Sequence, residues 1–265
     1  MPFRKLLPEI FDSANPLVFM GQASQAALGE TITLLVWNVY KTRKRGWHDD
    51  FLKLSRNKDL ILLQESVLNN LDNSIFKNAN RFEWIMACSH KYRISQIITG
   101  LKTGCVAKSC SQEFLHSPDK EPLVNTSKLM LATTYSLENS LNQLLVLNVH
   151  AINFVTLKKY TRHINQILSV IQHHTGPIIL AGDFNCWNAA RLEFLFGRIK
   201  NEGLTVVALE REPRWHHLNH HLDYIFYRDL HLIKAETLFD INSSDHYPII
   251  AEFKGSHLTT LTFGQ

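Results

Sequence analysis

Carboxylate, amide and imidazole side chains follow short apolar runs at several points along this chain of 265 residues. Asp183 and Asn185 lie in the run AGDFN, and Asp245 and His246 lie in SSDHYP. Comparable positions in other strand-like segments are held by Asn38, Glu65, His150 and Asp223. Strands that are buried along their length and polar at their ends can gather side chains from distant parts of a chain around one pocket. The pattern therefore predicts one active site built from strand ends.

Glu65 is the candidate metal ligand, because it follows the apolar run ILLQ and offers a hard oxygen. Mg²⁺ and Mn²⁺ prefer carboxylate and water ligands to sulfur or imidazole. Taken alone, each of these residues also has an ordinary structural interpretation. A strand-end Asp or Asn forms turns, a glutamate stabilises a helix N-terminus, and a single histidine packs in a core. The ordered occurrence of the whole set favours the catalytic interpretation.

In this order the motifs resemble those of the endonuclease/exonuclease/phosphatase superfamily. These metal-dependent phosphoesterases include DNase I, AP endonucleases, bacterial sphingomyelinases and inositol polyphosphate phosphatases. The resemblance covers residues 31–253 and is closest to the uncharacterised bacterial YafD-like branch. It rests on the segments LLVWNVYK, ILLQES, LNVHAINF, AGDFNCWN, LDYIFYR and SDHYP.

The resemblance implies a role for each residue in phosphodiester hydrolysis, which needs neutralised phosphoryl oxygens, an activated water and a stabilised leaving oxygen. His246 matches the family's catalytic histidine, and Asp223 matches the aspartate that fixes its tautomer and raises its basicity. We expect this dyad to be the general base. Asp183 is expected to orient the attacking water or to protonate the leaving oxygen.

The remaining positions are expected to bind the metal ion and the phosphoryl group. Glu65 matches the glutamate that holds Mg²⁺ or Mn²⁺, and Asn38 matches the asparagine beside that ion. Asn185 and His150 are expected to contact the phosphoryl group, and His150 is the residue type that DNase I and the sphingomyelinases place there. Asp245 is expected to hold the water shell of the metal or a second ion.

Two weaker features can each be interpreted as functional or as ordinary surface structure. The basic run of Lys41, Arg43, Lys44 and Arg45 either binds phosphates or is a solvated surface. A second cluster either lines the substrate groove or binds a transition metal, or else forms an ordinary polar loop, which its irregular spacing favours. That cluster comprises Trp215, His216, His217, His220 and His221.

Many strands and few helices, without a strict βαβ alternation, predict an α+β fold. The resemblance sharpens this to a DNase I-like, four-layer α/β/β/α sandwich of two packed mixed β-sheets flanked by helices. The pattern predicts strands near 31–37, 60–64, 82–87, 128–135, 143–149 and 178–182, and three or four more up to residue 253. Helices are predicted near 47–56, 67–78, 158–174 and 189–200. The polar stretch 91–124 is predicted to be a specificity loop with one short strand around Cys105.

Length and composition are typical of one large domain. We divide the chain into an N-terminal arm of open role (1–29), a catalytic domain (30–256) and a C-terminal tail (257–265). The four cysteines lack metal-ligand spacing and are expected to be reduced, with Cys105 and Cys110 the one pair able to bridge locally. Neither a signal peptide nor a membrane-spanning stretch is evident, so a cytoplasmic protein is the expectation.

The net charge of +4 is compatible with a polyanionic substrate but too small for a protein that coats nucleic acid. The first expectation is nuclease-like activity on DNA or RNA. The alternative is a phospholipid or inositol phosphate hydrolase, which should expose an apolar rim near its pocket. A third possibility is an inactive binding module. Nothing in the sequence indicates an obligate protein partner.

Overall fold

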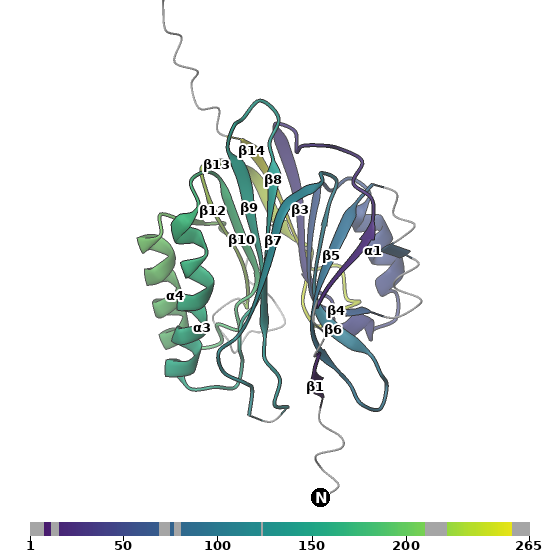
Figure 1. The fold of residues 1–265 in the computed structure, drawn as a ribbon, viewed down its shortest axis with the longest axis vertical. Coiled ribbons are helices and arrows are strands. Elements are labelled where there is room, and N and C mark those ends of the chain that lie inside the picture. The colour runs from purple at the N-terminus through teal and green to yellow at the C-terminus, as the bar shows by residue number, and fades with distance from the viewer. Residues whose placement is uncertain are drawn as a thin grey trace, which may run out of the picture.

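In the computed structural model, two β-sheets pack face to face and helices lie on their outer faces (Figure 1). The structure describes residues 8–11, 16–68, 75–76, 81–122, 124–209 and 222–255. The predicted α/β/β/α sandwich is confirmed. The first sheet has the order β1-β5-β6-β4-β3-β14-β13, and β2 also pairs with β5. Its strands are β1 (Glu9–Ile10), β2 (Leu17–Gly21), β3 (Thr31–Asn38), β4 (Leu60–Leu68), β5 (Glu83–Lys91), β6 (Ile98–Cys105), β13 (Leu230–Thr237) and β14 (Ile249–Gly255).

The second sheet has the order β11-β12-β10-β9-β8-β7. Its strands are β7 (Ser109–His116), β8 (Leu129–Ser136), β9 (Gln143–His150), β10 (Ile178–Asp183), β11 (Thr205–Val206) and β12 (Asp223–Arg228). Helix α1 (Trp47–Ser55) covers the first sheet, and α3 (Leu157–Ser169) and α4 (Ala189–Asn201) cover the second (Figure 1). Two short 3-10 helices span Tyr40–Thr42 and Ile171–His173.

The central strands are apolar along most of their length because both of their faces are buried. In β9, Leu144 and Val146 pack in the core between the sheets. Leu145 and Leu147 point the other way and pack with residues of α3 and α4. This alternation means that the residues of each strand can be assigned to the space between the sheets or to the helix side by counting in twos.

The prediction of a loop across 91–124 is wrong for most of that stretch, because the whole of β6 and the whole of β7 lie within it; the strand expected around Cys105 is the end of β6. Gly104, a residue type typical of loops, is needed inside β6: a Cβ there would lie 2.4 Å from the ring of Trp84. The polar side chains of Thr99, Lys102 and Thr103 are buried in the same strand. A strand that carries glycine for close packing and buried polar groups has the composition of a loop.

The prediction of a helix near 67–78 is wrong at its start, because residues 67 and 68 belong to a strand. Strand β4 runs through Leu68, and Val67 pairs with Thr99 of β6. Most of the remaining predicted range, residues 69–74 and 77–78, lies outside the described residues.

The described part of residues 8–29 contributes β1 and β2 at the edge of the first sheet, where both pair with β5. Residues 256–265 lie outside the described part of the chain. All four cysteines are free, including Cys105 and Cys110. Among the described helices, none is both long enough and apolar enough to cross a bilayer.

Candidate active site

Three of the predicted site residues lie side by side at the ends of neighbouring strands. His150 ends β9, Asp183 ends β10, and Asp223 begins β12. The strand register pairs Asp183 with His150 on one side and with Asp223 on the other. By the alternation along β10, Asp183 shares the face of Ala181, which packs between the two sheets. The second sheet therefore delivers all three side chains to its inner face.

The backbone at the AGDFN segment explains its glycine. Gly182 has φ +138°, and a Cβ at this position would lie 2.0 Å from the carbonyl oxygen of Val149 in the adjacent strand. Asn185 also has a positive φ, of +50°. Its backbone N–H donates to Oδ1 of Asp183 at 2.9 Å, and its side-chain amide donates to the carbonyl of Ala151. Close strand packing and this turn together fix Asp183.

His246 and Asp223 form the expected dyad, in which Nδ1 of the imidazole donates to Oδ2 of Asp223 at 2.6 Å. Both side chains are buried. Burial alone would lower the pKa of His246, but Asp223 raises it to about 10, and Asp183 and Asp245 act in the same direction. The imidazole is therefore protonated at neutral pH. The indole of Trp37 donates to the His246 carbonyl at 3.1 Å and holds this part of the backbone against β3.

Asp183 contacts three of the other predicted site residues, Asn38, His150 and His246. Its Oδ2 accepts a hydrogen bond of 3.1 Å from Nδ2 of Asn38, which ends β3 in the opposite sheet. The same oxygen lies 3.4 Å from Nε2 of His150 and 4.0 Å from Nε2 of His246. Burial and then the neighbouring Asp223 raise the pKa of Asp183, although His246 opposes them. The carboxyl group of Asp183 is therefore easier to protonate than that of an ordinary aspartate, and it lies beside the protonated His246.

His150 is buried between Asp183 and Lys128. The ammonium of Lys128 donates to Nε2 of His150 at 3.0 Å and lies 3.7 Å from the carboxylate of Glu121. Burial and then the charge of Lys128 lower the pKa of His150 well below its usual value. His150 is therefore a neutral imidazole, and Lys128 is the cation on this side of the pocket.

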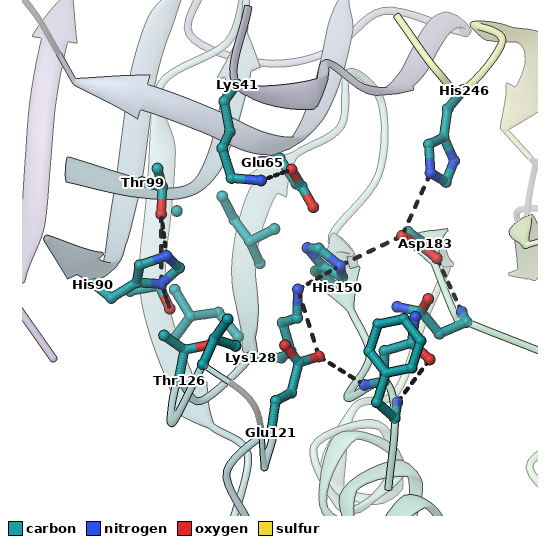
Figure 2. Close-up of a pocket in the computed structure, with 18 of the residues that line it drawn as sticks. Lys41, Glu65, His90, Thr99, Glu121, Thr126, Lys128, His150, Asp183 and His246 are labelled. Atoms are coloured by element: carbon teal, nitrogen blue, oxygen red, sulfur yellow. Dashed lines mark hydrogen bonds and ion pairs between the residues drawn. The ribbon is translucent and has the colours of Figure 1, made fainter. Parts of the chain in front are cut away.

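Glu65 lies across the pocket from Asp183 (Figure 2). The register of β4 against β6 shifts between Leu63 and Ser66, and within this irregularity Glu65 adopts φ +51°. Its carboxylate is paired with the ammonium of Lys41. Burial would raise the pKa of Glu65, but Lys128 and Lys41 lower it to about 2, so the carboxylate is ionised at neutral pH.

These side chains line one pocket of about 380 Å³ (Figure 2). Six of the eight predicted residues line it, namely Glu65, His150, Asp183, Asn185, Asp245 and His246. Asn38 and Asp223 contact it through their hydrogen bonds to Asp183 and His246. The other lining residues include His90, Tyr92 and Thr126, together with Lys128 and Glu121.

Comparison with known proteins identifies the chain's relatives. Residues 35–246 match the model of the Endonuclease/Exonuclease/phosphatase family. The chain belongs to this family. Its members are phosphoesterases, and all eight predicted site residues fall within the matched range.

Individual proteins resemble the chain in sequence or in fold. A UPF0294 protein of Photorhabdus laumondii is 32% identical over 227 residues, which cover 84% of this chain and 83% of the relative. An endonuclease/exonuclease/phosphatase from Beutenbergia cavernae has a similar structure, with a TM-score of 0.70 at 13% identity over 85% of this chain and 72% of that one. The human Nocturnin catalytic domain has a TM-score of 0.64 at 16% identity, over 90% and 97% of the two chains.

The donor set around Glu65 fits a magnesium or manganese ion. Asn38 lies opposite Gln64 in the paired strands, one residue from Glu65, so a carboxylate and an amide oxygen come from adjacent strands. Mg²⁺ is commonly held by one or two carboxylates and several waters rather than by a full protein cage. A cluster of three or more acidic, histidine or cysteine ligands does not occur among the described residues.

The structure separates the members of the basic run. Lys41 enters the pocket, whereas Arg43, Lys44 and Arg45 are exposed. Lys44 donates to the carbonyl of Ser244 at 2.7 Å. The cluster of Trp215 and its neighbouring histidines lies outside the described residues.

Arg191 is a buried residue of the site that sequence reasoning missed. It donates to the carbonyls of Asn185 and Val155 at 3.0 and 2.9 Å, and it stacks over the rings of Tyr160 and Trp187. It thereby joins the segment after β10 to the segment after β9. An arginine in the first turn of an amphipathic helix carries no sequence signal that distinguishes this role from solvent exposure.

Proposed function

We propose that this protein is a divalent-metal-dependent phosphodiester hydrolase. The observation that carries the proposal is the continuous buried contact from Asp223 through His246 to Asp183, and from there to Asn38 and His150, beside the ionised Glu65. A buried pair of proton-accepting groups, a neutral imidazole and an ionised carboxylate within one pocket match the requirements of phosphoryl chemistry.

Water activation is assigned to the dyad of His246 and Asp223. Because His246 is protonated at neutral pH, its Nε2 must lose a proton before it can accept one from water. Asp183 lies 4.0 Å from Nε2, and its raised pKa suits it to receive that proton. Asp223 then stabilises the imidazolium that forms when the water is deprotonated.

The phosphoryl oxygens would be bound by the cations and donors of the pocket. Lys128 and Lys41 point into it from opposite sides (Figure 2), and the amide of Asn185 lines it beside Asp183. Glu65 and Asn38 would hold Mg²⁺ or Mn²⁺. When bound, such an ion supplies charge neutralisation for the phosphoryl and leaving oxygens.

The first candidate substrate is a nucleic acid, cleaved in a nuclease-like reaction. The modest positive charge and the exposed Arg43, Lys44 and Arg45 support it. We also propose that the protein belongs to the YafD-like branch and that it is located in the cytoplasm. The second candidate substrate is a phospholipid or inositol phosphate. It is favoured by Val124 and Phe154, two exposed apolar residues that line the pocket.

The test is hydrolysis of bis(p-nitrophenyl) phosphate, plasmid DNA, single-stranded RNA and phospholipid vesicles, with Mg²⁺ or Mn²⁺ and with EDTA. We expect metal-dependent turnover that His246→Ala and Asp183→Ala each reduce on the order of a hundredfold or more. His173→Ala is the matched control, because His173 is exposed on the outer 3-10 helix. Full activity in the His246→Ala protein would contradict the assigned mechanism. If the wild-type protein bound Mg²⁺ or Mn²⁺ but hydrolysed none of these substrates, an inactive binding module would be favoured.

A further inference from the structure

Large apolar side chains are exposed around the mouth of the pocket. Nine such side chains are exposed among the described residues, and five of them lie on the segments that surround this pocket. These five, which we call the apolar rim, are Ile94, Val124, Phe154, Leu157 and Trp187. Val124 and Phe154 line the pocket itself. Exposed apolar residues scattered singly need no explanation, but this concentration at one site does.

Four different connections supply the apolar rim. Ile94 lies in the β5–β6 hairpin, Val124 in the β7–β8 connection, Phe154 and Leu157 at the start of α3, and Trp187 between β10 and α4. The hairpin and the β7–β8 and β9–α3 connections extend along the same edge of the molecule, the lower edge of Figure 1. The rim therefore consists of separate projections from different connections.

Hydrogen bonds hold these connections in place. The backbone N–H of Asn153 donates to Oε1 of Glu121 at 2.9 Å. The side-chain oxygen of Asn153 accepts from the indole of Trp187 and from the backbone N–H of Phe154, each at 2.8 Å. Phe154 is held at φ +51° with 65% of its surface exposed. A conformation that is disfavoured for an aromatic residue is thus maintained by polar contacts, with the ring directed outward.

Exposed basic residues accompany the apolar ones on the same connections. Lys120 lies in the β7–β8 connection and Lys158 follows Leu157, whereas Arg93, which precedes Ile94, already pairs with Glu9 at 3.3 Å. The nearby acidic groups are already engaged, since Asp119 pairs with Arg162 at 3.0 Å and Glu121 with Lys128 at 3.7 Å. The surface around the apolar rim is therefore suited to an anionic partner.

A bilayer satisfies both features better than a nucleic acid does. Bases can stack on Phe154 or Trp187, but the aliphatic side chains of Ile94, Val124 and Leu157 offer no stacking face. Separate apolar projections flanked by lysine and arginine are typical of residues that enter the acyl boundary while cations contact anionic headgroups. Tryptophan is likewise enriched at the membrane interface.

We propose that the apolar rim inserts into the surface of a bilayer that contains anionic phospholipid, so that the pocket faces the headgroup layer. The docking itself requires no catalysis. The consequence that the pocket receives the phosphodiester of a headgroup rests on the function proposed above, and it would make a membrane phospholipid the substrate.

The test is sedimentation of the full-length protein with vesicles, without added divalent metal. Vesicles contain equal parts of phosphatidylcholine and phosphatidylglycerol, or phosphatidylcholine alone. We expect binding to the anionic vesicles that Phe154→Ser and Ile94→Ser each weaken roughly tenfold, as expected for one lost apolar side chain. Leu141→Ser is the matched control, because Leu141 is fully exposed at the β8–β9 turn, at the far end of the strands. It should bind as the wild type does.

Fluorescence supplies a second readout. Brominated lipids should quench Trp187, whereas Trp37, Trp47 and Trp84 are buried. Because the chain also contains Trp215, which lies outside the described residues, the measurement is made in a Trp215→Phe protein, in which Trp187→Phe should lose most of the quenching. Thermal unfolding of each variant shows that the fold is retained.

The outcomes separate docking from catalysis. Hydrolysis of bis(p-nitrophenyl) phosphate without vesicle binding would overturn the docking surface and leave the proposed hydrolase intact. Vesicle binding that depends on the apolar rim and persists in the His246→Ala protein would support docking, even if no diester were hydrolysed. Equal losses in Leu141→Ser and Phe154→Ser would overturn it. So would rim-dependent binding of single-stranded DNA in the absence of vesicle binding.

Discussion

His246 is the residue on which the electrostatics of the site converge. Three carboxylates, those of Asp223, Asp183 and Asp245, raise its pKa against the opposing effect of burial. Asp223 is the largest of these influences and also accepts the hydrogen bond from Nδ1. The charge of one imidazole at neutral pH therefore depends mainly on one neighbouring carboxylate.

Asp223→Asn should lower the pKa of His246 from about 10 toward its ordinary value, because the amide carries no charge. Titration of the imidazole protons by NMR, with the His246 signal assigned from the His246→Ala spectrum, measures this shift. Asp240→Asn, at an exposed turn, should leave the signal unchanged. An unaltered His246 titration in the Asp223→Asn protein would show that another group sets its charge.

The residues that meet in the pocket could be named from the sequence, because polar groups at the ends of apolar runs form a recognisable pattern; their roles stay predictions. The neighbouring groups that set the charge of these site residues could not be named from the sequence. Lys41 and Lys128 are two of many basic residues, and only the fold places them beside Glu65 and His150. Arg191 appears in a helical pattern that gives no indication of its burial.

Among the elements, β10 does most to position the site. Its residues alternate between the inter-sheet core, with Ile179 and Ala181, and the helix side, with Ile178 and Leu180. Continuing the alternation places Asp183 on the inner face. Gly182 is required because β9 approaches so closely that no side chain fits.

Gly182→Ala should destabilise the protein by about 3 kcal/mol or more, since the added Cβ would meet the carbonyl of Val149 and φ +138° is disfavoured for alanine. Gly197→Ala is the control. Gly197 lies within α4, where an added Cβ would have nothing within 4 Å, so alanine should stabilise the helix by about 0.5–1 kcal/mol. Denaturant unfolding of both variants measures the difference, and equal stabilities would refute this account of β10.

Elements with one chemical character along their length were predictable, and elements with mixed character were not. Strands β3, β9 and β10 each contain an unbroken central apolar run, and their predicted bounds agree with the structure to within about a residue or two. Strand β6 contains glycines and buried polar groups, so its pattern matched a loop. The pairing of Val67 with Thr99 extends β4 beyond the point where local helix preference began, which shows tertiary contacts overriding that preference.

At the scale of the whole molecule, the shifted pKa values link folding to pH in opposite directions. His246 has a raised pKa in the folded state, so its stabilisation is fully present below its unfolded value of about 6.5 and is lost as pH rises through about 10. The raised pKa of Asp183 acts in the same direction. Glu65 has a lowered pKa, so its contribution is present above about 4.5 and is lost as pH falls through about 2.

The melting temperature should therefore fall as pH rises from about 6.5 to 10, and again in acid as the pH approaches about 2. The alkaline decline should be shallower in Asp223→Asn and the acid decline shallower in Glu65→Gln. Thermal unfolding across this pH range, at constant ionic strength, measures both. A flat alkaline profile in the wild type would contradict the assigned charge of His246.

The pairing of Asp183 with both His150 and Asp223 constrains how the chain can change in length. Deleting one residue within 178–182 would shift every later position of β10 to the opposite face, turning Asp183 toward α3 and α4 and an apolar side chain toward the pocket. Single-residue insertions or deletions in this strand should therefore be rejected in natural variation. The β8–β9 turn, at the other end of the sheet, can change in length without altering the register of any site residue.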